Sequence, residues 1–291
     1  MATVVVHPNF DLTARGVASR LVTHLVERQS LARPVHVSVT GGGLGVAIWP
    51  LIASDPLAGA VDWTGVHVWF SDERFVSAGD PDRNDGALLA HAAGLGLPPG
   101  NVHSIPGPDQ VPDARAAADA YAATLAAWAG GGPGGGTVGE ARWRSGHEAH
   151  ARGRQNGNGL EDGTPGEAQH RLGDGVPTPY FDVSILGIGP DGHVASLFPG
   201  RSRDAEREES VIPVADAPKP PPERVSFTRR VLCHCDELWM IAAGADKACA
   251  VSRALSGDDP DRTPAAGVHG RRRTLWLVDS ALADAIASPT L

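Results

Sequence analysis

The sequence predicts an α/β fold: a doubly wound, mostly parallel sheet with helices on both faces. Short runs rich in Val and Ile alternate with longer stretches of helical periodicity, the pattern of parallel strands joined by helices. The chain has 291 residues and 42% of them are hydrophobic, enough for one large α/β domain with a real core. We therefore expect residues 1–291 to form a single domain.

Each expected strand is a short run rich in β-branched or aliphatic residues, and each expected helix is a longer run with apolar residues at helical spacing. The strands are predicted at 3–6, 35–40, 66–71, 181–188, 211–214, 224–228, 238–243 and 274–278. The helices are predicted at 12–27, 44–53, 114–128, 246–255 and 281–287.

The segment 130–177 interrupts this alternation. It opens with GGGPGGG and continues through scattered charges and glycines. Apart from alanines, its apolar residues are only Val138, Trp143, Leu160, Leu172 and Val176. Burying so little apolar surface does not offset the entropy of ordering the segment, which predicts a flexible insertion in a surface connection. A partner-binding segment or a lid is the functional alternative.

The net charge of −9 and the pI near 5.7 argue against nucleic acid and anionic membranes as partners, because both require a basic surface. Any bound phosphate must therefore meet a local cluster of positive groups. The start MATVVVHPNF lacks a basic segment followed by an apolar one, and no apolar run is long enough to span a membrane. We expect a cytoplasmic protein that is a monomer or a weak dimer.

The cysteines do not indicate disulfides or a metal site. Their number is odd, and CHCD at 233–236 lacks the second ligand pair of a structural zinc site. We expect Cys233, Cys235 and Cys249 to be reduced thiols and expect neither a metal ion nor a cofactor.

The first candidate site motif is the glycine run Gly41, Gly42 and Gly43, between a predicted strand and a predicted helix. Glycines let the backbone approach an anion closely, and a helix N-terminus offers unpaired N–H groups. The run therefore suits a phosphate or an oxyanion. A tight strand-to-helix turn explains the glycines equally well, since the run matches neither the Walker nor the dinucleotide pattern.

The second motif, Asp72, Glu73 and Arg74, follows the strand at 66–71. It is expected at the carboxyl edge of the sheet, where open α/β sheets bind ligands. Arg74 can grip a phosphate through two N–H groups while a neighbouring carboxylate holds the guanidinium. An exposed ion pair is the alternative.

The third motif is a turn of glycine, proline and aspartate that ends the strand at 181–188 and projects His193 at the same edge. A histidine there can take a proton from water, although a turn histidine is often only a polar surface residue. Lys247 follows the strand at 238–243 and is expected to point to the same edge. The alternative is that Lys247 is only a solvated surface residue, as most lysines are. Together the motifs offer N–H groups, two cations and one base at one rim of the sheet.

These residues resemble the 6-phosphogluconolactonase family over nearly the whole chain outside 130–177. LGIGPDGHVASLFPG at 186–200 is similar to the most specific family signature, and FSDERFV at 70–76 is similar to its W-x-D-E-R-x-V block. DAPKPPPERVSFT at 216–228 and GADKA at 244–248 follow in the family's order. Two positions depart from the pattern: TGGGLG at 40–45 replaces the usual S-G-G-S-T-P, and Arg201 stands where histidine is frequent.

The resemblance implies a sugar-phosphate isomerase type of sheet and a metal-free hydrolysis of 6-phospho-D-glucono-1,5-lactone in the oxidative pentose phosphate pathway. It implies that His193 activates water, with Asp191 shaping the turn or orienting the imidazole. The implied substrate-binding residues are Gly41, Gly42, Gly43, Asp72, Arg74, Lys247 and, through a possible contact, Arg201.

Three rival interpretations remain open. Ser196 as a nucleophile lacks the G-x-S-x-G elbow, and we expect it to be a helix residue. An amino-sugar phosphate deaminase shares the G-x-G-x-D-G-H turn, but ASLFPG after that turn resembles the lactonase. A non-catalytic sugar-phosphate sensor is disfavoured by the acidic charge and by the lack of a helix-turn-helix segment.

Overall fold

The computed structural model describes residues 2–129 and 178–287. The segment 130–177, predicted to be a flexible insertion, lies outside the described residues, so that expectation stays a prediction. Nearly all buried apolar side chains of the described part belong to one hydrophobic core.

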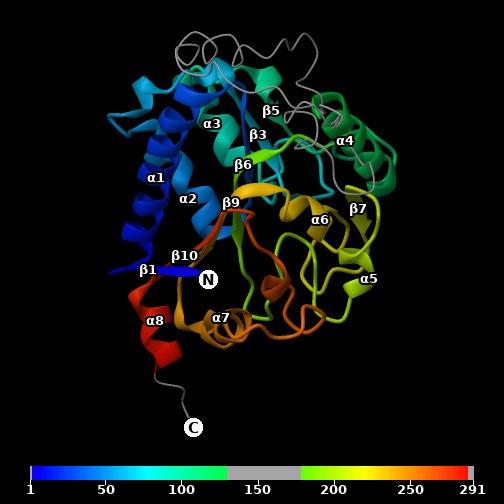
Figure 1. Ribbon diagram of the computed structural model, residues 1–291. Coiled ribbons are helices and arrows are strands. Elements are labelled where there is room, and N and C mark those ends of the chain that lie inside the picture. The colour runs from blue at the N-terminus through cyan, green and yellow to red at the C-terminus, as the bar shows by residue number, and fades with distance from the viewer. Residues whose placement is uncertain (1, 130–177, 288–291) are drawn as a thin grey trace, which may run out of the picture.

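Within the described residues, the main sheet has seven strands in the order β1-β10-β9-β6-β2-β3-β5, and its neighbouring strands pair in parallel. The strands are β1 (Thr3–His7), β2 (Val35–Val39), β3 (Val66–Phe70), β5 (Val102–His103), β6 (Phe181–Gly187), β9 (Cys235–Ala242) and β10 (Arg273–Asp279). This confirms the predicted α/β fold with a mostly parallel sheet (Figure 1).

The helices connect and cover these strands. They are α1 (Phe10–Leu31), α2 (Gly42–Ala53), α3 (Gly86–Leu95), α4 (Ala114–Trp128), α5 (Ser202–Ala205), α6 (Arg229–Leu232), α7 (Ala248–Leu255) and α8 (Ser280–Ala287). Helix α4 packs on the face of β2 and β3 that bears His36 and His67, and α1 and α2 lie on the other side of these strands (Figure 1). Among the described residues, no helix combines the length and the apolar character needed to cross a membrane.

A second, antiparallel sheet was not anticipated as a separate unit. Its strands, in the order β4-β8-β7, are β4 (Asp72–Arg74), β8 (Arg224–Phe227) and β7 (Val211–Val214). The runs at 211–214 and 224–228 were predicted as strands, and they pair with each other. The third strand, β4, pairs with β8 and is only three residues long, too short to show an alternation of its own. The second sheet places Asp72 and Arg74 opposite β8.

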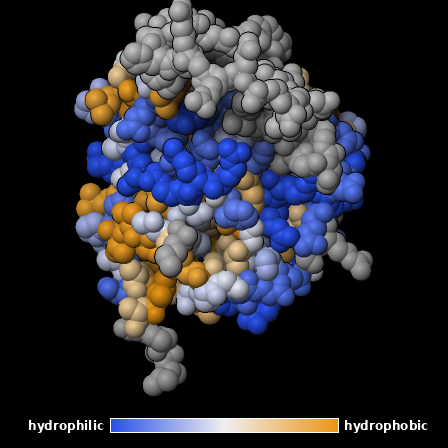
Figure 2. Space-filling model, viewed as in Figure 1, coloured by the Kyte–Doolittle hydropathy of each residue, from blue (hydrophilic) through white to orange (hydrophobic). Residues whose placement is uncertain are grey.

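The edge strand β1 is more exposed than its Val-rich sequence suggests. In the part of the chain that the structure describes it pairs only with β10, and Val4 and Val6 are 45% and 52% exposed. Figure 2 shows apolar residues gathered on this part of the surface, around β1 and the start of α8. The central strands β2, β3 and β6, in contrast, are almost completely buried.

Three histidines are stacked inside the protein between the main sheet and α4. The rings of His36 and His103 lie on either side of His67, at centroid distances of 5.1 and 5.3 Å, and Trp128 of α4 covers them. A hydrogen bond of 3.1 Å joins Nδ1 of His67 to Nε2 of His103. Burial lowers the pKa of His67 to about 4 and the pKa of His103 to about 3.

This cluster predicts a loss of stability in acid. Below about pH 6.5 the unfolded chain binds protons at these two histidines while the folded chain does not. The free energy of unfolding therefore falls as the pH drops from about 6.5 towards 4, by at most about 1.4 kcal/mol per pH unit for each histidine. Glu73, whose pKa burial raises to about 7, acts in the opposite direction over part of this range.

A His67→Gln/His103→Gln variant, compared with the wild type, separates the contribution of the two histidines to this pH dependence from the contribution of Glu73. Urea unfolding at pH 7 and pH 5 is expected to show a smaller loss of unfolding free energy in the double variant than in the wild type. Equal losses in both proteins would contradict this account.

Candidate active site

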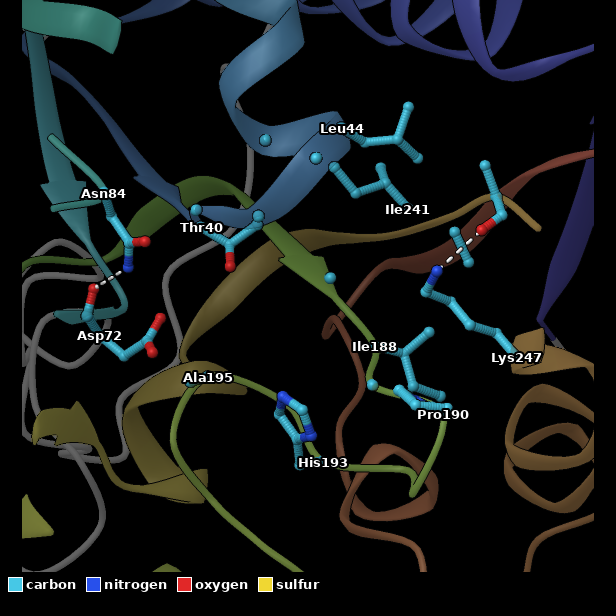
Figure 3. A pocket seen from close by; sticks show the side chains of 18 of the residues that line it. Thr40, Leu44, Asp72, Asn84, Ile188, Pro190, His193, Ala195, Ile241 and Lys247 are labelled. Atoms are coloured by element: carbon cyan, nitrogen blue, oxygen red, sulfur yellow. Dashed lines mark hydrogen bonds between the residues drawn. The ribbon is translucent and has the colours of Figure 1, made fainter. Parts of the chain in front are cut away.

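A cavity of about 420 Å³ lies at the carboxyl ends of β2, β6 and β9. Its wall is completed by the start of α2, the β4 segment and the loop before β8, so residues far apart in the chain face one space (Figure 3). The polar side chains that line it are those of Thr40, Asp72, Arg74, Asn84, His193, Lys219, Arg224, Asp246 and Lys247.

The structure brings most of the predicted site residues to this cavity. Those that line it are Gly41, Gly42, Gly43, Asp72, Arg74, His193 and Lys247. They converge because the carboxyl ends of parallel strands meet at one edge of the sheet. Asp191 lies directly behind His193, whereas Arg201 lies elsewhere.

The turn that carries His193 is closed by backbone hydrogen bonds. The Gly189 N–H donates to the His193 carbonyl at 3.0 Å, and the Gly192 N–H donates to the Gly189 carbonyl at 2.9 Å. Gly192 has φ +98°, a conformation that favours glycine. The imidazole is thus held next to the end of β6 with little freedom of the backbone, and Figure 3 shows it beside the cavity.

Asp191 fixes the orientation of the imidazole. Its Oδ1 lies 2.5 Å from Nδ1 of His193. Partial burial raises the pKa of Asp191, but the hydrogen bonds from His193 outweigh this effect and lower that pKa to about 2. An ionised Asp191 assigns the Nδ1 proton to the imidazole, which leaves Nε2 of neutral His193 as a base.

The glycine loop adjoins Asn84, a residue that the motifs did not indicate. A Cβ on Gly41 would overlap the side chain of Asn84, so glycine is required there. Asn84 Nδ2 donates to the Asp72 carbonyl at 2.8 Å, and its Oδ1 accepts from Nη1 of Arg74. Helix α2 begins directly after Gly41, so its first N–H groups face the cavity without a capping side chain.

Arg74 is held differently from the prediction. No carboxylate pairs with it among the described residues; Nη1 donates to Asn84 and, at 3.1 Å, to the Asp82 carbonyl. Glu73 instead accepts from the backbone N–H groups of Arg74, Asn84 and Asp85. The positive charge of Arg74 is therefore not neutralised by a partner and is available to an anion.

Asp72 and Ser196 form a buried hydrogen bond between the two sides of the site. Ser196 Oγ donates to Asp72 Oδ2 at 2.8 Å. Ser196 lies in a turn, so the prediction that it is a helix residue was wrong. Its hydroxyl is directed to Asp72, and Ser196 does not line the cavity. The local sequence VASLF resembles the start of a helix, but Val194 and Leu197 instead form an isolated antiparallel bridge.

Three further cations line the cavity. Lys247 is at the N-terminus of α7, and its Nζ donates to the Ala243 carbonyl at 2.8 Å. Lys219 and Arg224 lie within DAPKPPPERVSFT but had been given no role. Arg224 is nearly buried, donates to the carbonyls of Lys219 and Pro221, and lies 5.7 Å from the centroid of Phe198.

The cavity is positively charged although the chain is acidic. Its lining carries the cations Arg74, Lys219, Arg224 and Lys247 against the carboxylates Asp72 and Asp246. The chain as a whole has a charge of −9. This is the local cluster that an acidic protein needs to bind a phosphate. Among the described residues, no group of three or more His, Cys, Asp or Glu is placed to hold a metal ion.

Arg201 does not reach the cavity. Its guanidinium donates to the carbonyls of Ala215 and Asp216, and Arg201 is not among the cavity-lining residues. The structure therefore does not support the predicted substrate contact. A loop position after FPG cannot be oriented from sequence, because no strand directs its side chain.

We accordingly expect Arg201→Gln to leave the KM for a sugar phosphate within about twofold of the wild type, because a group outside the cavity contributes little binding energy. Steady-state kinetics would measure this. A large rise in KM with unchanged thermal stability would show that Arg201 reaches the substrate after all.

The cysteines lie apart from this site. Cys233 is partly buried, Cys235 is buried and Cys249 is exposed, and none of them forms a disulfide among the described residues.

Comparisons with known proteins agree with this geometry. The profile of the family "Glucosamine-6-phosphate isomerases/6-phosphogluconolactonase" matches residues 8–276. A 6-phosphogluconolactonase of Streptomyces coelicolor is 38% identical over 283 residues, covering 96% of this chain and 93% of the relative.

Solved structures show the same fold. A 6-phosphogluconolactonase from Trypanosoma cruzi matches with a TM-score of 0.71 and 19% identity, covering 98% of this chain and 96% of the other. A monomeric glucosamine-6-phosphate deaminase matches with a TM-score of 0.65 and 15% identity, covering 97% and 99%. The solved structures show the fold alone, whereas the family profile and the Streptomyces relative identify the protein family. The chain belongs to the family of glucosamine-6-phosphate isomerases and 6-phosphogluconolactonases.

Proposed function

We propose that this chain is an enzyme that hydrolyses 6-phospho-D-glucono-1,5-lactone to 6-phospho-D-gluconate, a step of the oxidative pentose phosphate pathway. The observation that carries the proposal is the His193–Asp191 pair beside a cavity rich in cations. The name of the Streptomyces relative, which is 38% identical over 96% of this chain, supports the same activity.

The substrate phosphate binds among the cations and the N–H groups at the start of α2. Arg74 and Lys247 are the principal contacts, with Gly41, Gly42 and Gly43 supplying backbone donors. Lys219 and Arg224 line the same cavity and add positive charge. Binding the phosphate at a fixed place positions the lactone carbonyl near His193, and such positioning contributes strongly to the rate of an already activated ester.

The chemistry needs one base. Neutral His193 takes a proton from water at Nε2 as the water oxygen bonds to C1 of the lactone. The tetrahedral intermediate then collapses, the bond from C1 to the ring oxygen breaks, and the imidazolium returns the proton to that oxygen. The product is the open hydroxy acid. Asp191 accepts from Nδ1–H throughout and stabilises the imidazolium. No step requires a metal ion or a cofactor.

Asp72 recognises the sugar. Ser196 donates to Oδ2 of its carboxylate, and Asp72 lines the cavity to the left of His193 in Figure 3. A sugar hydroxyl can donate to the carboxylate. The hydrogen bond from Ser196 keeps Asp72 directed at the substrate, which is a structural use of that serine instead of a nucleophilic one.

The nearest rival is the deamination of glucosamine 6-phosphate, because a deaminase shares this fold. Purified protein is expected to open fresh phosphogluconolactone faster than the spontaneous reaction, followed in a pH-stat, and to release no ammonia from glucosamine 6-phosphate. Ammonia release without lactone turnover would favour the deaminase. Binding of phosphogluconate without turnover of either compound would favour a sugar-phosphate sensor.

We further propose that the protein acts in the cytoplasm as a monomer or a weak dimer, without nucleic acid or membrane partners. The overall negative charge supports the exclusion of those partners. Sedimentation over a range of protein concentrations would measure the oligomeric state.

A further inference from the structure

The turn at 189–193, which carries His193 and is called the catalytic turn below, is also bound on its side away from the cavity. The residues that bind it there come from α7 and from the segment after α7. The Asp191 carbonyl accepts from Nη2 of Arg253 at 3.2 Å. The next carbonyl, that of Gly192, accepts from the Ala265 N–H at 3.0 Å. Two consecutive peptide groups of the turn are thus tied to α7 and to the segment that follows it.

Arg253 is itself held in place. Its Nε donates to Thr263 Oγ1 at 2.9 Å, and Thr263 Oγ1 in turn donates to Asp258 Oδ2 at 2.8 Å. Its Nη1 lies 3.3 Å from the sulfur of Cys249. Thr263 is completely buried. The guanidinium therefore has a defined position from which its Nη2 reaches the turn.

Thr263 also packs against the turn directly. A Cβ on Gly192 would lie 3.0 Å from Thr263 Cγ2, so the two residues are in close contact. The turn is consequently enclosed by Arg253 and Thr263 behind and by the cavity in front. Moving Arg253 would release the Asp191 peptide while the Gly192 peptide stayed bound, which would tilt the Asp191 side chain.

That tilt matters because the imidazole of His193 meets Asp191 through one short contact, 2.5 Å from Nδ1 to Oδ1, while the His193 backbone N–H donates to the same oxygen at 3.4 Å. On the basis of the proposed function, we infer that Arg253 is a positioning residue for the hydrolysis: it fixes the peptide of Asp191 so that the carboxylate orients the imidazole. Arg253 touches neither the cavity nor His193 and acts only through Asp191.

Helix α7 connects Arg253 with the cavity-lining Lys247. The same short helix, Ala248–Leu255, directly follows Lys247, its N-cap residue, which lines the cavity. The helix carries Arg253 in its last turn. One rigid element thus bears a cation for the phosphate and the anchor of the catalytic turn. This arrangement keeps the distance between phosphate and base constant, which is what positioning of the lactone requires.

The test compares Arg253→Gln with Arg262→Gln. Arg262 is a matched control because its Nη2 lies 3.6 Å from Asp258 Oδ2, as does Nε of Arg253. Arg262 is 71% exposed, however, and does not touch the turn. Arg253→Gln is expected to lower kcat about tenfold to hundredfold, since small displacements of a catalytic group have effects of that size. KM should change by less than about threefold because the phosphate contacts remain. Arg262→Gln should resemble the wild type.

A double-mutant cycle with Asp191→Asn separates an effect of Arg253 on the position of Asp191 from an effect on the stability of the fold. In an Asp191→Asn background the imidazole has already lost its carboxylate, so adding Arg253→Gln should lower kcat by less than about threefold. Arg253→Lys should recover little of the lost kcat, because one ammonium cannot reach both Thr263 and the Asp191 carbonyl. Equal losses in both backgrounds, or a rise in KM without a fall in kcat, would overturn the inference.

A measurement without substrate distinguishes this inference from the proposed function. Proton–nitrogen NMR spectra of the imidazole groups, with His193 assigned by its disappearance in His193→Ala, should show a changed His193 signal in Arg253→Gln and an unchanged one in Arg262→Gln. Should the lactone not be turned over, this result would still support the positioning role, and an unchanged His193 signal would refute it.

Discussion

Replacing His193 with glutamine is expected to lower kcat/KM for phosphogluconolactone by about 10²- to 10⁴-fold, the usual contribution of a positioned general base. Glutamine retains a polar side chain of similar reach but cannot take a proton from water. The cations of the cavity remain, so the affinity for 6-phosphogluconate, measured by calorimetry, should be nearly unchanged. Initial rates must be corrected for spontaneous opening of the lactone.

The exposed His269 provides the control for this substitution. It lies outside the cavity, and His269→Gln should therefore turn over lactone like the wild type. Undiminished turnover in His193→Gln would refute the assignment of the base. A burst of product together with an adduct on Ser196 would point to covalent catalysis instead.

The convergence of the candidate site residues that directly follow the ends of parallel strands was predicted correctly from the sequence. The runs at 35–40, 181–188 and 238–243 correspond to β2, β6 and β9, and their carboxyl ends bring Gly41, His193 and Lys247 to one cavity. This followed from one rule of parallel sheets and needed no knowledge of the loops. Helices α1, α2, α4, α7 and α8 were predicted as well, with ends that differ by a few residues at most.

What could not be predicted depends on loops and on pairing between distant segments. Asn84 reaches Arg74 and Gly41 from the loop between β4 and α3, where no periodicity indicates the direction of a side chain. Lys219 and Arg224 reach the cavity because β8 pairs with β4 in the small sheet. Pairing of that kind leaves no local pattern in a strand of three residues.

The same reason explains the error on the partner of Arg74. Adjacent carboxylates suggested an ion pair, but Asp72 binds Ser196, and Glu73 binds the backbone of the loop that carries Asn84. The acidic residues of the D-E-R motif therefore organise the site around Arg74 without neutralising it. A sequence shows which charges are adjacent, and only the fold shows which of them meet.

Gly189 leads to the second large expected effect, because one added methyl group should abolish most of the turnover. A Cβ at this position would overlap the imidazole of His193 and lie 2.5 Å from Oδ1 of Asp191. The backbone of Gly189 does not lie in the left-handed region, so alanine can adopt it. The imidazole, as the end of a side chain, would move instead of the backbone. Gly189→Ala should thus separate His193 from Asp191 while the fold remains intact.

We expect Gly189→Ala to lower kcat about 10²-fold or more, close to the effect of His193→Gln, because a displaced base is nearly as ineffective as an absent one. Gly187→Ala is the matched control: Gly187 lines the same cavity two residues earlier, but the nearest atom to its added Cβ is Thr40 Cγ2 at 3.9 Å, an ordinary contact. It should retain most of the wild-type kcat. Melting temperatures of both variants would separate displacement from unfolding. Full activity in Gly189→Ala would mean that the catalytic imidazole does not occupy the position next to Gly189, and the proposed orientation by Asp191 would fail with it.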